Sequence, residues 1–191
     1  MAGQKPKSGR AQVAIIALVF FGPLILATWM YNTGRFAPEG SSNSGALLEP
    51  LVNLGDALPS SPIVPMADNV WLMVYAKDDA PCGKNCREAL YRQRQTRLML
   101  GKEMERVVRV FLHGDSSPDT VFLEGEHPGL KTIRDKELGA LLDEKRPKDL
   151  VPGGIYLIDP LANLVMYFPP DLDPRDMVED LKHLLKLSRI G

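Results

Sequence analysis

The sequence is poor in the residues that build metal clusters and disulfide frameworks. Its 191 residues include two cysteines and three histidines. Two cysteines cannot form a disulfide framework, and a four-ligand zinc site would have to gather histidines from distant segments. The net charge is -1, so bulk charge gives no argument for nucleic-acid binding. The sequence also lacks a Gly-rich phosphate loop, a G-x-S-x-G motif and an H-E-x-x-H motif, which leaves little support for the enzyme classes that these motifs mark.

Charged residues are also missing from one long apolar run near the N-terminus. Residues 13–30 carry no charge, and a run of this length is at the lower limit for a membrane-spanning helix. Three basic residues and no acidic residue precede it, which by the positive-inside rule puts the N-terminus in the cytoplasm. We therefore expect a cytoplasmic tail at 1–12 and a transmembrane helix at 13–31. The alternative is a cleaved signal peptide, but its apolar core is usually shorter.

The positive N-terminal flank also predicts where the rest of the chain lies. With the tail in the cytoplasm, everything after the helix is outside the cytoplasm. In a Gram-negative bacterium this means a single-pass protein of the inner membrane with a periplasmic domain. Residues 32–45 are rich in Gly, Ser and Asn, so we expect a flexible tether there. The folded domain would then occupy residues 46–191.

Hydrophobic periodicity predicts the elements of that domain. Prolines rule out a long helix before residue 70, so we expect an extended lead-in with one edge strand. The other expected elements are strands at 70–76 and 106–114, a helix at 85–104, a short strand at 119–125, a helix in the second half of 129–145, a hairpin at 153–168 and a helix at 172–190. Asp173 and Pro174 are typical of the start of that last helix.

The order of these elements predicts the fold class. A βαβ unit followed by ββα is the arrangement of a thioredoxin-like α/β domain, with parallel strands first, a hairpin later and helices on both faces. The polar centre of the first helix, "RQRQTR" at 92–97, is expected to be a solvated face, and the alternative is a basic docking surface. Of the histidines, we expect His127 to be a solvated loop residue and His183 to be a surface or packing residue.

Both cysteines, Cys82 and Cys86, lie in "DDAPCGKNCREAL", after the first buried strand and at the start of the first helix. A helix N-terminus carries partial positive charge, which stabilises a thiolate, and Lys84 adds charge of the same sign. A thiolate attacks disulfides and binds soft metals, of which Cu(I) suits two cysteines better than zinc does. Three interpretations stay open: thiol redox chemistry, copper handling and a structural disulfide.

Several stretches in order resemble the Sco/SenC family, which comprises membrane-anchored, thioredoxin-fold proteins that help assemble cytochrome c oxidase. They are "VWLMVYAKDDAPCGKNCREAL", "RVVRVFL" and "YLIDPLANLVMYFPPDLDPRDMVEDLKHLL". "GALLEP" and "RQTRLMLG" are similar to a shorter set of proteobacterial membrane proteins associated with oxidase assembly. The resemblance implies that Cys82 and Cys86 bind Cu(I), and that the partner is an oxidase subunit or another assembly factor.

The resemblance also implies a third copper ligand, a histidine about five residues before the tyrosine of "YLID". This chain has Val151 at that place and no histidine from 128 to 182. His113, at the end of the second core strand, is the candidate substitute; the alternative is a loop histidine without a metal. We therefore expect an assembly factor that handles copper or exchanges thiols through Cys82 and Cys86. The alternative is a non-catalytic thioredoxin-fold binding module with a structural disulfide.

Overall fold

The computed structural model describes residues 9–33, 43–77, 82–115 and 118–188, so most of the predicted tail and tether lie outside the described residues. The chain divides into two units, Met1–Ser41 and Ser42–Gly191. In the first, α1 (Gly9–Thr33) is a single helix that contains Pro23. Its segment Gln12–Met30 has a mean hydropathy of 2.4 and contains no buried residue. This helix is long and apolar enough to cross a membrane.

The second unit is built on one six-stranded sheet of order β1-β6-β5-β2-β3-β4. Its strands are β1 (Ala46–Asn53), β2 (Trp71–Lys77), β3 (Val107–His113), β4 (Lys131–Arg134), β5 (Ile155–Ile158) and β6 (Asn163–Phe168). The neighbours β2, β3 and β4 are parallel, whereas β5 is antiparallel to β2 and β6, and β1 is antiparallel to β6. The predicted parallel pair, edge strand and hairpin are all present.

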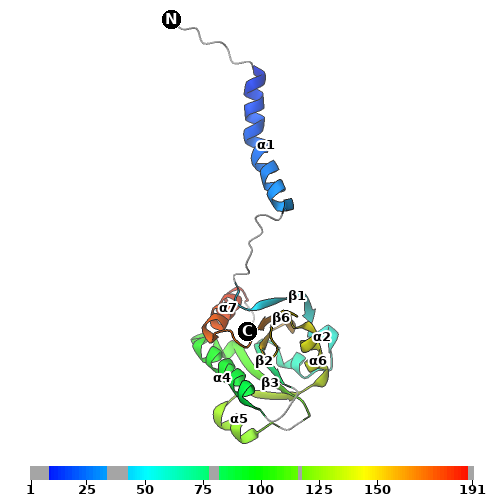
Figure 1. The fold of residues 1–191 in the computed structure, drawn as a ribbon, viewed down its shortest axis with the longest axis vertical. Coiled ribbons are helices and arrows are strands. Elements are labelled where there is room, and N and C mark those ends of the chain that lie inside the picture. The colour runs from blue at the N-terminus through cyan, green and yellow to red at the C-terminus, as the bar shows by residue number, and fades with distance from the viewer. Residues whose placement is uncertain (1–8, 34–42, 78–81, 116–117, 189–191) are drawn as a thin grey trace. The chain divides into compact units, whose positions relative to one another are not determined.

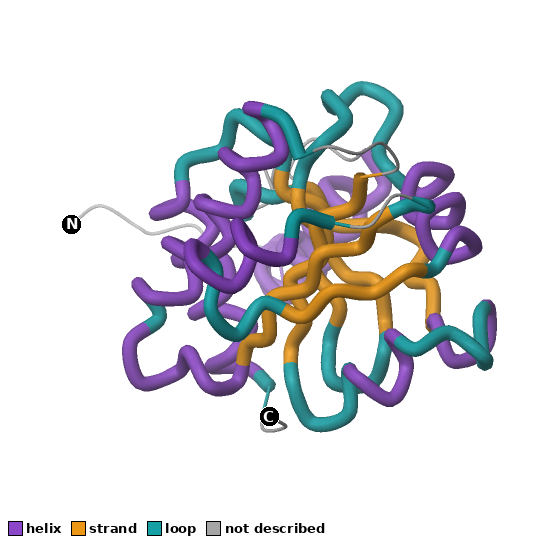
Figure 2. The backbone as a smooth tube through the Cα atoms, turned by 90° about the horizontal axis from the view of Figure 1, so that it is seen from below, coloured by secondary structure: helices purple, strands orange, loops and turns teal. Residues whose placement is uncertain are grey.

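Helices cover both faces of this sheet (Figure 2). Along β2, Met73 and Tyr75 face the core under α4 (Lys84–Met99) and α7 (Pro174–Leu187), while Leu72 and Val74 face α6 (Lys136–Lys145). The remaining helices are α2 (Leu54–Ala57), α3 (Ile63–Met66), α5 (Thr120–Glu126) and the 3-10 helix η1 (Gly101–Arg106) (Figure 1). Because both faces are covered, β2 is a nearly continuous apolar run rather than an alternating one.

The last helix begins where the sequence predicts. The Asp173 carboxylate accepts the backbone N–H of Arg175, and Pro174 is the first residue of α7. Pro is suited to this position because its fixed φ fits a helix and its missing N–H would have no partner in the first turn. His183 lies on the exposed side of α7, as expected.

Two sequence predictions about the helices were wrong. Residues expected as a strand at 119–125 form α5, because the Asp119 carboxylate caps the helix by accepting the N–H of Phe122. The polar centre of α4 is not a solvated face, since Gln93 and Thr96 are fully buried. The Gln93 Nε2 donates to the carbonyl oxygens of Met73 at 2.5 Å and Val110 at 3.2 Å. Hydrogen bonding to strand carbonyls lets this polar side chain be buried.

The start of the second unit is tied to its last helix by Asp180. This carboxylate, 4 % exposed, accepts the N–H of Ser44 at 3.2 Å and that of Gly45 at 2.7 Å. Gly45 leaves no room for a side chain, because a Cβ there would lie 2.6 Å from the Met166 sulfur. The chain therefore enters β1 through a fixed, closely packed point.

Candidate functional site

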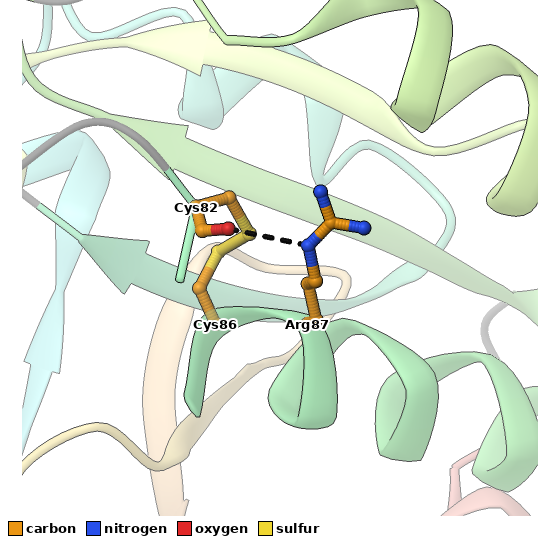
Figure 3. The surroundings of a disulfide bond; sticks show 3 residues. All are labelled: Cys82, Cys86 and Arg87. Atoms are coloured by element: carbon orange, nitrogen blue, oxygen red, sulfur yellow. Dashed lines mark hydrogen bonds between the residues drawn. A yellow bond between two sulfur atoms is a disulfide. The ribbon is translucent and has the colours of Figure 1, made fainter. Parts of the chain in front are cut away.

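Cys82 lies between β2 and α4, and Cys86 lies in α4. A disulfide joins them, with their Cα atoms 5.2 Å apart (Figure 3). Gly83 caps the helix, which begins at Lys84, so Cys86 is in the first turn and Cys82 just precedes the cap. The N–H groups of a first helical turn carry partial positive charge. Once the disulfide is reduced, this position favours a thiolate.

The two sulfur-bearing side chains differ in access. Cys86 is 1 % exposed and packs in the core between the sheet, α4 and α7. Cys82 is half-buried and only borders that core. A reacting group from another molecule therefore reaches Cys82 first, and Cys86 is accessible mainly through Cys82. This asymmetry suits a pair in which one cysteine attacks and the other resolves.

Arg87 stands directly beside the disulfide, as Figure 3 shows. Its Nε donates to the carbonyl oxygen of Cys82 at 3.4 Å, and its guanidinium carbon lies 3.9 Å from the centre of the Phe122 ring. The neighbouring Lys84 is exposed and pairs with Glu88 at 3.8 Å. Sequence patterns did not single out Arg87 or Phe122, because their contact joins α4 to α5, which are far apart in the chain.

The position at which the resemblance to Sco/SenC proteins implies a third copper ligand has no donor side chain here. Val151 is 60 % exposed, and its carbonyl oxygen accepts the Tyr167 hydroxyl at 2.5 Å. The same hydroxyl accepts the N–H of Gly154 at 2.9 Å, so Tyr167 holds the loop before β5 from the inside.

His113 ends β3 in register with Lys77, the last residue of β2, and so lies at the sheet end from which the cysteine loop leaves. Its Nδ1 is 2.9 Å from the Gly114 carbonyl oxygen. Within residues 9–33, 43–77, 82–115 and 118–188, no three His, Cys, Asp or Glu side chains are grouped to hold a metal. The described side chains thus do not gather His113 with both cysteines, and its role as a ligand stays a prediction.

His127 is not the solvated loop residue that the sequence predicts. It is 3 % exposed, and its ring packs edge-on to Phe122 at 5.2 Å between centroids. Burial lowers the pKa of this imidazole, and the positive charges of Arg94 and Arg109 lower it further. The loop histidine is buried because α5, which the sequence did not predict, folds its own end against α4.

Residues 71–188 match the protein family described as "transmembrane-like, thioredoxin-like, C-terminal domain". The chain belongs to this family. Residues 3–34 match the companion family "transmembrane-like, N-terminal domain". This second match covers α1, so sequence similarity and helix composition both support a single-pass membrane anchor in this family member. A comparison with curated proteins finds no match.

Among solved structures, this family member is similar to yeast Sco1 with copper bound, at 17% identity and a TM-score of 0.52 over 65% of this chain and 80% of that one. It is also similar to apo Sco1 from Thermus thermophilus, at 16% identity and a TM-score of 0.52 over 76% of this chain and 99% of that one. Similarity at this level of identity establishes the fold. The predicted thioredoxin-like fold and the resemblance of that fold to Sco proteins are confirmed.

Proposed function

We propose that this protein is a membrane-anchored thiol–disulfide factor that reduces cysteines of a cytochrome oxidase subunit or of another oxidase assembly factor. The observation that carries the proposal is the unequal exposure of the two cysteine side chains. Cys82 is half-buried, whereas Cys86 is buried in the first turn of α4. The basic residues before α1 support an orientation with the N-terminus in the cytoplasm. The thioredoxin-like domain then works outside the cytoplasm, anchored to the inner membrane.

The reduced pair donates two electrons in two steps. The Cys82 thiolate attacks one sulfur of the partner's disulfide, which forms a mixed disulfide and releases the first partner thiolate. The Cys86 thiolate then attacks the Cys82 sulfur, which closes the Cys82–Cys86 disulfide and releases the second partner thiolate. The two thiol protons pass to the partner's thiolates. A dithiol donor in the same compartment must reduce Cys82–Cys86 before another cycle.

The choice of the oxidase as the partner rests on the resemblance to Sco proteins. Copper is a soft metal that binds thiolates, so cysteines destined to bind it have to be reduced first. A membrane-anchored reductant close to the oxidase meets that need. The similarity of the fold to yeast Sco1 with copper bound supports this assignment.

Trapping the mixed disulfide tests the proposal. In the full-length Cys86→Ser protein, the first step can occur but the resolving step cannot, so a partner with a disulfide should remain linked to Cys82. The matched Cys82→Ser protein keeps only the buried thiol and should trap far less. Non-reducing gels of membranes from cells that express each variant, followed by identification of the linked peptide, give the result. Equal trapping by both variants, or none by either, would refute the exchange step.

Copper transfer is a second candidate, with Cu(I) as cargo rather than a resident cofactor. Reduced Cys82 and Cys86 supply two soft ligands, which Cu(I) accepts, and His113 is the candidate third ligand. Anaerobic Cu(I) titration of the reduced full-length protein against a competing chelator tests it. Tight one-to-one binding that disappears in Cys82→Ser/Cys86→Ser supports copper transfer, and weaker binding in His113→Ala supports the third ligand. Equal retention of copper by the wild type and the double variant would exclude this function.

A further inference from the structure

A groove opens beside the disulfide, between α4 and α5, with a volume of about 530 Å³. Its walls are formed from α4 by Lys84, Arg87, Glu88 and Tyr91, and from α5 by Phe122 and Glu126. Arg87 connects the groove to the cysteines, since it lines the groove and donates to the Cys82 carbonyl. A segment lying in this groove therefore contacts Arg87, which is hydrogen-bonded to the backbone of the half-buried cysteine.

Flat side chains make up much of the groove. Phe122 lies between the Arg87 guanidinium, 3.9 Å from its ring centre, and the edge of His127, which also lines the groove. Arg94 does not line the groove but borders it, because its guanidinium carbon lies 5.5 Å from the centre of the Tyr91 ring, which does line it. Arginine stacked on an aromatic ring keeps its N–H groups free at the edges, where they can meet a carboxylate in two parallel hydrogen bonds.

The positive charges around this groove exceed the negative ones. Lys84 and Glu88 neutralise each other as an ion pair. Arg87, Arg94 and Arg109, in contrast, have no carboxylate within ion-pair distance among the described residues; Arg94 donates instead to the backbone oxygen of Glu126. The charges of the groove wall itself balance, since Lys84 and Arg87 oppose Glu88 and Glu126. The local positive excess comes from Arg94, which contacts the wall residues Tyr91 and Glu126, and from the buried Arg109.

Buried polar atoms behind the groove also lack partners. Arg109 is 4 % exposed and donates through Nη2 to the Pro128 oxygen at 2.6 Å, but its Nη1 has no partner among the described residues. The Nδ1 of His127 is likewise without a partner there. A buried cation without a counter-charge is costly, and an anion placed nearby reduces that cost. Both observations indicate that the groove is complementary to a negative group.

We infer that this groove binds an acidic segment of a partner protein, with carboxylate side chains of that segment held by Arg87, which lines the groove, and by Arg94, which borders it. A protein segment fits better than a small anion, because the groove has aromatic walls along its length and leads to Cys82. The part of the inference that puts the partner's cysteine at Cys82 rests on the proposed thiol exchange. Recognition of a carboxylate does not depend on thiol exchange, so carboxylate recognition and thiol exchange can be tested separately.

Peptide binding to the full-length protein in lipid nanodiscs tests carboxylate recognition. Using Cys82→Ser/Cys86→Ser removes thiol chemistry from the measurement. The probes are fluorescein-labelled peptides that alternate glycine with glutamate around one serine, and matched peptides with glutamine or lysine in place of glutamate. Fluorescence anisotropy at low ionic strength should show the glutamate peptide binding about tenfold more tightly than the glutamine peptide, with the lysine peptide weakest.

Variants then locate the binding site. Arg87→Gln and Arg94→Gln, each added to the double serine background, should weaken binding of the glutamate peptide by about fivefold to tenfold. Lys182→Gln, which removes an exposed cation from α7, should leave binding unchanged. Far-UV circular dichroism confirms that each variant is folded.

Three results would overturn the inference: equal binding of the glutamate and glutamine peptides, an equal effect of Lys182→Gln and Arg87→Gln, or no binding of any probe. If Cys86→Ser traps a partner but the glutamate preference is absent, thiol exchange stands and the acidic groove is refuted. If the preference is present without trapping, the groove stands and thiol exchange is refuted.

Discussion

Replacing Asp180 by alanine should loosen the point at which the chain enters the folded domain. Asp180 is 4 % exposed on α7, and its two carboxylate oxygens accept the N–H groups of Ser44 and Gly45. The alanine variant removes both acceptors at once. It leaves the buried N–H of Gly45 without a partner in a place that the surrounding side chains keep from water.

The size of this effect follows from the two contacts. Hydrogen bonds to a charged acceptor contribute about 1.5–3 kcal/mol each. The Gly45 bond, at 2.7 Å and buried, belongs at the upper part of that range, whereas the Ser44 bond, at 3.2 Å and only partly buried, contributes less. We expect a loss of about 3 kcal/mol in the free energy of unfolding. For a domain of this size that loss lowers Tm by roughly 6–12 °C.

Thermal unfolding of the full-length protein in detergent, followed by circular dichroism, measures this loss, and hydrogen exchange locates it at the amides of Ser44 and Gly45. Asp180→Asn keeps one oxygen acceptor and should lose only about 1 kcal/mol. Glu179→Ala, at an exposed neighbouring position on the same helix, serves as the matched control. If Asp180→Ala unfolds at the same temperature as Glu179→Ala, the carboxylate does not hold the start of the domain, and the reasoning is refuted.

Three further predictions concern the loops around the site. Gly154→Ala should cost about 2 kcal/mol or more, because a Cβ there would overlap the Phe168 carbonyl oxygen, which belongs to rigid backbone. Acidification should destabilise the oxidised protein below about pH 6.5, since burial lowers the pKa of His127 in the fold and the unfolded chain then binds the proton first. Reduction of the Cys82–Cys86 disulfide should lower stability by about 2 kcal/mol, the loop-closure value for so short a loop. Chemical denaturation of each form measures all three.

Each of these predictions has a control within the chain. Gly125→Ala, where a Cβ meets nothing within 4 Å, should not destabilise α5. His127→Gln should flatten the stability profile below neutral pH, while the same change at the exposed His183 should leave the slope in place. The Cys82→Ser/Cys86→Ser protein should not respond to reductant. A Gly125→Ala effect as large as that of Gly154→Ala would mean that steric overlap is not the cause, and an unchanged acid slope in His127→Gln would mean that another group titrates.

Local signals were sufficient for much of the fold. The apolar run of β2 is recognisable because both of its faces are buried, and the start of α7 is recognisable because Asp173 and Pro174 act within one turn. The predicted anchor follows from an uncharged apolar run that is long enough to cross a bilayer. Prediction failed at α5, where β-branched and aromatic residues favour a strand, but a cap from Asp119 starts a helix instead.

The candidate site also has some features that the sequence predicts and others that it does not. The sequence by itself indicated the apolar run of α1, the strands and helices other than β4 and α5 that frame the site, and the place of Cys82 and Cys86 at the start of a helix, because each depends on residues close together in the chain. The tertiary structure alone decided that Cys86 is buried while Cys82 is accessible, and that Arg87 lies on Phe122 beside them. These features depend on how α4 packs against the sheet and against α5, and contacts between segments distant in sequence leave no periodic or local pattern from which to predict them.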